Sequence, residues 1–383
     1  MNAIYADQAA TSFPKAEGVS EAITKYLLSN GKNIGRGGYQ SAYETANLVY
    51  DVREKLCRLF DFDKPSNVVF TANITYAINM IIKGFLKEGD HVLVSSMEHN
   101  AVMRPLVQLA NEKQVEFSRI PCNSFGELCV EKVEGMIKKN TKAIIMLHAS
   151  NVSGTVMPIE KVGKIAKKNG LFFIVDSAQT AGVIPISMKE MKIDALTFTG
   201  HKGLLGPQGI GGFLITDQLA NQLTPLVSGG TGSMSDSEEI PDFLPDRFEA
   251  GTLNLPGIIG LGEALSYLEQ TGINHIYQHE MELTKYFLEG VKKIPSFQII
   301  GHEDISNRTA VVSLQWKKGD EALLAFELDH SYGIMTRVGM HCAPNAHKTL
   351  GTFPKGTIRF SFGHKNKKEE IEEILAVLTK VRC

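Results

Sequence analysis

One lysine stands between an apolar strand pattern and a run of glycines. Residues 197–212 read TFTGHKGLLGPQGIGG, and the lysine is Lys202. A lysine that follows a buried strand lies at the carboxyl edge of a sheet, where open α/β folds bind ligands. Partial burial there would favour the neutral amine, which forms a Schiff base with an aldehyde; the alternative is a surface lysine on a turn. The glycines allow the backbone close to a bound group, but they lack the Gly-Lys-Ser/Thr sequence of a P-loop.

A carboxylate occupies the corresponding position in a neighbouring strand pattern. Asp176 ends the apolar run LFFIVD. It either caps the following helix or keeps a pyridine nitrogen protonated, which makes the ring an electron sink. In the second interpretation Gln179 and His201 are within reach. A strand-terminal Asp followed by a strand-terminal Lys is the order expected of enzymes that use pyridoxal phosphate.

Two more strand patterns end in polar residues. In FTANITYAINMII (70–82), Asn73 and Thr75 either cap the following helix or bind a phosphate at its N-terminus, where free N–H groups and the helix dipole attract anions. In SSMEHNAV (95–102), His99 is either a core histidine or an imidazole that stacks on an aromatic cofactor and exchanges protons near neutral pH.

A cysteine in TRVGMHCAPNAHKTLG (336–351) is a candidate reactive thiol. Glycine and proline place Cys342 on a loop, where a thiol is accessible. Arg337 and His341 would favour the thiolate, although neighbouring side chains on an extended chain point apart, so His341 is not assumed to be its base. The Cys-His pair alone gives weak support for a cysteine hydrolase, because no orienting Asp or Asn stands out.

Near-continuous apolar runs alternate with segments of helical period, which predicts a doubly wound, mainly parallel α/β sheet. The runs cover residues 67–70, 91–95, 142–148, 171–176, 194–200 and 211–216. A helix at 256–270 marks a change of pattern. Beyond it we expect a smaller α+β domain, with strands at 309–314, 334–338 and 357–361, a helix at 320–331, and a final helix. Residues 228–246 are rich in Gly, Ser, Asp and Pro and predict a long loop of unassigned role.

Composition restricts the class of partner. The chain has 383 residues and a formal net charge of −2, so we expect no nucleic-acid partner and no anionic membrane surface. No apolar run approaches the length of a membrane span. Five widely spaced cysteines, without a CxxC pair or zinc-ligand spacing, predict reduced thiols, no metal site and a cytoplasmic location.

In combination, the motifs VDSAQ, FTGHKGLLGPQGIGG, RFEAGTLN and RVGMHCA resemble, in order and spacing, the class V, fold type I enzymes that depend on pyridoxal phosphate. The nearest resemblance is to the cysteine desulfurase family. It extends from IYADQAATSFPK to TIRFSFGHKN, which is nearly the whole chain. It departs at Gln8, where the family has Asn, and in TANIT, which lacks the usual Gly and Thr.

The resemblance implies a role for each matching residue. The implied roles are: Lys202 as the covalent cofactor anchor, Asp176 on the pyridinium nitrogen, Gln179 on the ring hydroxyl, His99 stacked on the ring, Thr75 and His201 on the phosphate, Asn151 near the ring hydroxyl and substrate, Arg359 on the substrate carboxylate, and Thr252 in the phosphate site of a neighbouring subunit. The resemblance therefore implies a homodimer with shared active sites. It also implies a large cofactor domain at 17–256 and a small domain formed by 1–16 and 257–383.

The loop RVGMHCA resembles the short form found in Suf-type, or type II, desulfurases. Cys342 would then accept sulfur from L-cysteine as a persulfide, release L-alanine, and pass the sulfur to an acceptor protein or small thiol. Two alternatives keep the fold: a selenocysteine lyase acting on L-selenocysteine, and an ordinary class V aminotransferase in which Cys342 is incidental. A third, a cofactor-binding scaffold without turnover, is disfavoured because the candidate catalytic set is intact.

Overall fold

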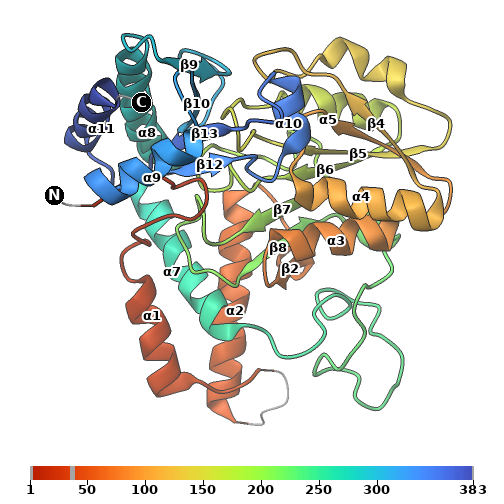
Figure 1. The fold of residues 1–383 in the computed structure, drawn as a ribbon. Helices are drawn as coiled ribbons and strands as arrows, with labels where there is room; N and C mark the ends of the chain where they lie inside the picture. Colours follow the sequence, from red (N-terminus) through yellow and green to blue (C-terminus); the bar gives the residue numbers. More distant parts are fainter. Residues whose placement is uncertain (1–2, 35–38, 382–383) are drawn as a thin grey trace.

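A seven-stranded sheet forms the centre of the protein in the computed structural model, which describes residues 3–34 and 39–381 (Figure 1). Its strand order is β2-β8-β7-β6-β5-β3-β4. The strands are β2 (Val68–Thr71), β3 (His91–Ser95), β4 (Glu116–Ile120), β5 (Thr141–Leu147), β6 (Phe172–Asp176), β7 (Ala195–Thr199) and β8 (Gly211–Ile215). Only β8 runs against its neighbours β2 and β7. The predicted α/β fold with a mainly parallel sheet is confirmed.

Both faces of this sheet are buried, which explains the near-continuous apolar runs. In β3, Val92 and Val94 contribute to one hydrophobic cluster and Leu93 to another, because alternate residues of a strand point to opposite faces. Helices α3 and α4 pack on the first face, and α1, α2, α5 and α7 belong to the second cluster. A ligand therefore reaches this sheet at the strand ends.

The helices of this part of the chain alternate with the strands. They are α1 (Val19–Lys25), α2 (Gln40–Leu59), α3 (Ile74–Phe85), α4 (Asn100–Lys113), α5 (Ile159–Lys168), α6 (Asp217–Ala220) and α7 (Leu255–Thr271). The buried face of α7 packs against α1 and α2. The chain leaves the large sheet along this helix.

A second sheet is antiparallel and has the order β12-β13-β10-β9. The elements of this region are β1 (Ile4–Tyr5), α8 (Ile273–Val291), β9 (Phe297–Ile300), β10 (Val311–Trp316), α9 (Glu321–Tyr332), β11 (Ile334–Met335), β12 (Arg337–Gly339), α10 (Pro344–Thr349), β13 (Thr357–Ser361) and α11 (Lys368–Lys380). Most of them enclose a third hydrophobic cluster, to which Ile4 and Ala6 also belong, whereas Ala346 of α10 belongs to a cluster of the large sheet. Because β1 pairs with β11, the N-terminal segment joins the C-terminal part of the chain, and Figure 1 shows both termini on this side.

Most predicted elements are found. The six strands expected in the large sheet appear with ends displaced by at most one residue, and 228–246 contains no helix or strand. Several elements were not predicted, among them β4, β9 and α8. Strand β4 is half exposed at the sheet edge, so its sequence lacks an apolar run, and the buried face of α8 is interrupted by Glu280.

Candidate active site

Five strands of the large sheet, β2, β3, β5, β6 and β7, run in the same direction. Their carboxyl ends therefore share one edge. The predicted residues that follow these strands are Thr75, His99, Asn151, Asp176 and Lys202, in that order. The topology gathers side chains that lie far apart in the sequence, at the edge where α/β folds bind ligands.

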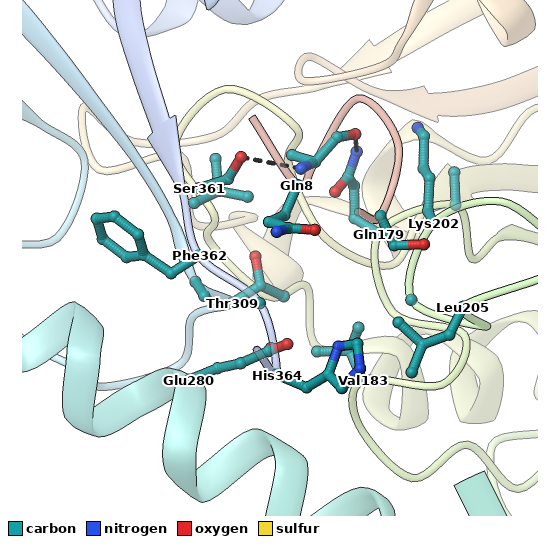
Figure 2. Close-up of a pocket in the computed structure, with 17 residues that line it drawn as sticks. Gln8, Gln179, Val183, Lys202, Leu205, Glu280, Thr309, Ser361, Phe362 and His364 are labelled. Atoms are coloured by element: carbon teal, nitrogen blue, oxygen red, sulfur yellow. Dashed lines mark hydrogen bonds between the residues drawn. The ribbon is translucent and has the colours of Figure 1, made fainter. Parts of the chain in front are cut away.

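Lys202 lies in the turn after β7 and is partly buried. Burial lowers the pKa of its amine to about 8; Arg359 and Arg337 add to this effect, and Asp176 opposes it. A larger fraction of the amine is therefore neutral near pH 7 than for an exposed lysine, and the neutral form is the one that attacks an aldehyde. Figure 2 shows the side chain extending away from Glu280 and His364.

Asp176 is the buried last residue of β6. Its Oδ1 accepts a hydrogen bond of 2.8 Å from the N–H of Ala178. Burial raises the pKa of the carboxyl, while the Ala178 N–H and Lys202 lower it. The side chain thus makes the turn contact expected of a cap and also lies within electrostatic reach of Lys202, so the two sequence interpretations are compatible.

Glu98, which the sequence shows beside His99 without assigning it a role, ties two strand ends together. Its oxygens each lie 3.1 Å from the N–H of Leu147 at the end of β5, and one accepts from the hydroxyl of Ser95 at the end of β3. Burial raises the pKa of Glu98 to about 8, although these hydrogen bonds lower it. The group fixes the turn that carries His99.

His99 is the N-cap of α4. Its Nδ1 accepts from the N–H of Ala101 at 3.0 Å, so in the neutral ring the proton is on Nε2. Burial lowers the pKa of His99 to about 4, and Lys202 and Arg337 add to the effect. A neutral, planar ring at this edge suits the predicted stacking role.

The N-terminus of α3 offers an exposed hydroxyl. Asn73 is the N-cap and accepts from the N–H of Tyr76 at 3.2 Å, so its capping interpretation is confirmed. Thr75 is exposed in the first turn of the same helix. Free N–H groups and a hydroxyl at a helix N-terminus can bind a phosphate.

His201 and Gln179 both contact the N-terminal segment. The Nδ1 of His201 lies 3.1 Å from Oγ1 of Thr11, and Nε2 of Gln179 donates to the carbonyl of Ala9 at 3.2 Å. Burial lowers the pKa of His201 to about 4. Sequence reasoning missed this contribution of the N-terminal segment, because the contacts join residues 170 and 190 positions apart and involve a main-chain carbonyl and a small hydroxyl.

Asn151 connects the strand edge to the cysteine loop. Its Nδ2 donates to the carbonyl of His341 at 2.7 Å, while Oδ1 is buried and has no partner among the described residues. The carbonyl of Asn151 accepts from Nη1 of Arg359 at 3.0 Å. One oxygen is therefore left for a ligand.

Arg359, on β13, is 2% exposed and already has an acidic partner. Its Nη2 lies 2.7 Å from Oδ1 of Asp7, while its buried Nε has no partner within the described chain. Burial lowers its pKa and Asp7 raises it. Asp7 belongs to the motif IYADQAATSFPK, and this motif was the only feature of the sequence that pointed to a role for it.

Cys342 is exposed in the short loop between β12 and α10. The loop is not extended: His341 and Cys342 have φ of 46° and 57°. The Nε2 of His341 lies 3.0 Å from Oγ1 of Thr357, and burial lowers the pKa of His341 to about 2. The expectation that His341 favours a thiolate is therefore corrected, because its ring is neutral and engaged elsewhere.

Thr252 is not brought to this edge. It is exposed in a groove with Arg53 and Glu249, which form a buried ion pair of 2.7 Å.

Several other properties bear on the class of site. Cys57, Cys122, Cys129 and Cys342 are free thiols, and Cys383 lies outside the described residues. Within 3–34 and 39–381, no group of three or more His, Cys, Asp or Glu side chains could hold a metal ion. None of the helices in this part of the chain combines the length and apolar character needed to cross a membrane.

The chain matches the class-V aminotransferase family over residues 4–374. Among its relatives are a probable cysteine desulfurase of Methanothermobacter thermautotrophicus, 32% identical with 99% of this chain and 94% of the relative covered, and one of Pyrococcus abyssi, 33% identical with the same coverage. An apo cysteine desulfurase from Thermococcus onnurineus superimposes with a TM-score of 0.92 at 32% identity, covering 99% of this chain and 94% of the other. The cysteine desulfurase CsdA from Escherichia coli gives 0.87 at 26%, covering 98% and 94%.

The fold and the strand-edge site thus define an enzyme of the class-V aminotransferase family. Within that family, the chain belongs with the cysteine desulfurases.

The residues at the strand edge fit the pyridoxal phosphate on which this family depends. Lys202 provides an amine with a pKa of about 8, and the buried Oδ1 of Asn151 has no partner among the described residues. Thr75 leaves an exposed hydroxyl at a helix N-terminus. The site therefore offers an amine, a free hydrogen-bond acceptor and a helix N-terminus that can bind a phosphate.

Proposed function

We propose that this protein is a pyridoxal phosphate-dependent cysteine desulfurase that converts L-cysteine to L-alanine and takes the sulfur onto Cys342 as a persulfide. The observation that carries the proposal is the attachment of the Cys342 loop to the strand edge. The Cys342 carbonyl accepts from the N–H of Asn100, beside His99, and the preceding carbonyl accepts from Asn151. A thiol held there is placed to meet a substrate bound near Lys202.

In this proposal, the cofactor supplies an electron sink that stabilises negative charge at the substrate Cα. The residues that would bind the cofactor are Lys202 as the covalent anchor, Asp176 at the pyridinium nitrogen, Gln179 and Asn151 at the ring hydroxyl, His99 on the ring face, and Thr75 and His201 at the phosphate. Asp176 serves the nitrogen only as an anion, so a cationic partner must offset the effect of burial on its pKa.

The side chains of the protein have separate roles in the reaction. Arg359 binds the substrate carboxylate, sharing its guanidinium with Asp7. Lys202 removes the proton from the substrate Cα, a role that suits an amine with a pKa of about 8. The Cys342 thiolate attacks the substrate sulfur, so that the S–S bond of the persulfide forms as the substrate Cβ–S bond breaks. The electron pair of that bond stays with the substrate, where Cβ takes up a proton to become the methyl group of alanine, and Lys202 returns the proton to Cα.

We also infer a homodimer in which Thr252 serves the partner subunit's phosphate site. Thr252 is exposed and separate from the strand edge of its own chain, as a residue with that role would be. Large apolar side chains are exposed in the helical turn 26–30 that follows α1, in α2 and in the 228–246 loop: Leu27, Leu28, Tyr43, Tyr50 and Phe243. Light scattering and mixed dimers of Thr252→Ala and Lys202→Ala chains test the inference, because shared sites would give partial activity from two inactive parents.

The remaining assignments belong to the same proposal. The few residues between β12 and α10 support a Suf-type loop, with an acceptor protein or small thiol receiving the sulfur. Free cysteines support a reducing, cytoplasmic location. We propose a large domain at 17–256 and a small domain formed by 1–16 and 257–383. The distinct hydrophobic cluster around the second sheet supports a separate small domain, while α7, at the boundary, packs against the large one.

The deciding experiment compares wild type with Cys342→Ala, measuring alanine and sulfide from L-cysteine with added reductant and recording the cofactor absorbance of both. We expect equal alanine and sulfide from wild type, and loss of turnover with retained cofactor in the variant. Turnover of L-selenocysteine alone by the variant would indicate a selenocysteine lyase component. Pyruvate-dependent amino transfer without alanine release from cysteine would replace the proposal with an aminotransferase.

A further inference from the structure

The loop that carries Cys342 is held in an unfavourable backbone conformation. His341 and Cys342 are consecutive non-glycine residues with φ of 46° and 57°. The left-handed region disfavours residues with a Cβ, and such conformations persist only where surrounding contacts hold them. The contacts that hold this loop therefore decide where the Cys342 thiol lies.

Two hydrogen bonds hold the two left-handed residues, and both come from the strand edge. The side chain of Asn151 donates to the carbonyl of His341 at 2.7 Å, and the main-chain N–H of Asn100 donates to the carbonyl of Cys342 at 2.8 Å. Asn100 is the first residue of α4 and Asn151 follows β5. We call these two bonds the Cys342 anchor.

A chain of hydrogen bonds ties the His341 ring to the same turn. The hydroxyl of Ser313 donates to the carbonyl of Val152 at 2.6 Å, and the hydroxyl of Thr357 donates to Ser313 at 3.1 Å. Since both hydroxyl protons are thereby used, Nε2 of His341 must donate to Thr357. Both the neutral ring and the protonated ring can donate from Nε2. Because burial lowers the pKa of His341, the ring is the neutral one.

Helix α10, which follows the loop, is fastened to the same region of the large sheet. Thr349, the last residue of α10, lies 3.0 Å from the hydroxyl of Ser96. Ser96 and Asn100 flank His99 in the turn between β3 and α4. The cysteine loop and the helix that follows it are thus both attached to the segment that carries the proposed ring-stacking histidine.

We propose that Asn100, through its main-chain N–H, is a positioning residue for sulfur transfer: with Asn151 it fixes the Cys342 thiol relative to the cofactor site. The inference rests on the proposed desulfurase function and assigns to Asn100 a role independent of its side chain, whose amide makes no hydrogen bond within the described chain. A free N–H is available for this purpose because the first N–H groups of a helix have no intrahelical partner.

The position of Asn100 allows one hydrogen bond to be removed with little effect on the helix. Proline is favoured at the first position of a helix, where it removes an N–H that the helix does not use. His99, the preceding residue, has φ −71° and ψ 154°, the extended conformation that a residue before proline adopts. Asn100→Pro therefore deletes the anchor bond, whereas Asn100→Ala deletes only the side chain and is the matched control.

The first measurement is hydrogen exchange of the 340–349 amides in the holoenzyme, followed by mass spectrometry. We expect exchange in Asn100→Pro to rise about fivefold, the effect of losing one net hydrogen bond, and Asn100→Ala to match wild type. Equal exchange in all three proteins would overturn the inference, and this readout does not depend on turnover. If Asn100→Pro does not fold, Thr349→Val replaces it: faster exchange over 344–349 supports the attachment, and unchanged exchange contradicts it.

The second measurement separates positioning from general loosening. After one turnover with L-cysteine, we expect Asn100→Pro to show the wild-type change in cofactor absorbance but about tenfold less persulfide on Cys342, with Asn100→Ala unaffected. Undiminished persulfide in Asn100→Pro would remove the positioning role. Absence of persulfide in wild type would instead contradict the proposed function, so the two failures are distinguishable.

Discussion

Lys202 separates two regions that use buried ionisable groups differently. On the strand-edge side, Asp176, His99 and Arg359 all affect the charge of Lys202 or are affected by it. On the other side lies a cavity of about 50 Å³, here called the rear cavity, whose lining includes Glu280 and Lys202 (Figure 2). Burial raises the pKa of Glu280 to about 8, but no nearby charge contributes, and its carboxyl has no hydrogen bond or ion pair among the described residues.

The comparison shows why a perturbed pKa alone does not identify an active site. Glu98 and Glu280 both have a pKa of about 8, yet one is bonded into the strand edge and the other is isolated. An active site needs several charged or hydrogen-bonding groups that point into the same volume. The strand edge satisfies this condition, so variants there should change chemistry, whereas a variant at Glu280 should change stability.

The largest expected effect comes from Lys202. Lys202→Ala removes both the covalent anchor and the base, so alanine release from L-cysteine should fall by about 1,000-fold or more. Glu280→Gln, on the other side of the same residue, should leave the rate unchanged. A rate loss in Glu280→Gln as large as that in Lys202→Ala would contradict the distinction between the two regions.

The second effect concerns pH. Because the neutral amine reacts with an aldehyde and burial lowers the Lys202 pKa to about 8, capture of added pyridoxal phosphate by cofactor-free protein should accelerate as pH rises and level off above 8. The rate should increase about tenfold per pH unit below that point. Stopped-flow absorbance gives the profile; continued acceleration to pH 10 would indicate an ordinary exposed lysine.

A smaller effect is expected at Arg359. Arg359→Lys keeps the charge but loses the planar fork, so KM for L-cysteine should rise about 10- to 100-fold with a smaller change in kcat. Steady-state kinetics measure this split. Arg58→Lys, at an exposed arginine paired with Glu269, is the control and should behave as wild type. A fall in kcat alone would argue against substrate binding by Arg359.

The smallest effect on turnover, but a measurable effect on stability, is expected at Glu280. Its folded-state pKa is raised above that of the unfolded chain, so the native state holds a proton that the unfolded state has lost between about pH 4.5 and 8. Stability therefore falls as pH rises through this window. Glu280→Gln should remove on the order of 1–3 kcal/mol of this loss between pH 5 and 8.

Urea unfolding at the two pH values measures the difference. Glu282→Gln, an exposed neighbour on α8, is the matched control and should retain the wild-type pH dependence. If Glu280→Gln also retained it, Glu280 would have an unrecognised partner, and the contrast with the strand edge would weaken.

Much of the fold was determined by the sequence itself. Apolar runs such as 91–95 and 171–176 predict buried strands because only a strand covered on both faces needs them, and the structure places these strands as expected. Strand-terminal residues such as Asp176 and Lys202 then share one edge because parallel strands end together. Local chemistry also identified Cys342 as a loop residue.

Tertiary structure alone decided the contacts that set each group's state. The pairing of Arg359 with Asp7, the binding of His201 to Thr11, and the isolation of Glu280 join or separate residues distant in the chain. The sequence determined which chemical groups reach the strand edge, because periodicity and turn residues act locally. Only packing decided how the Cys342 loop is held, because its anchor uses a main-chain N–H that every residue but proline possesses.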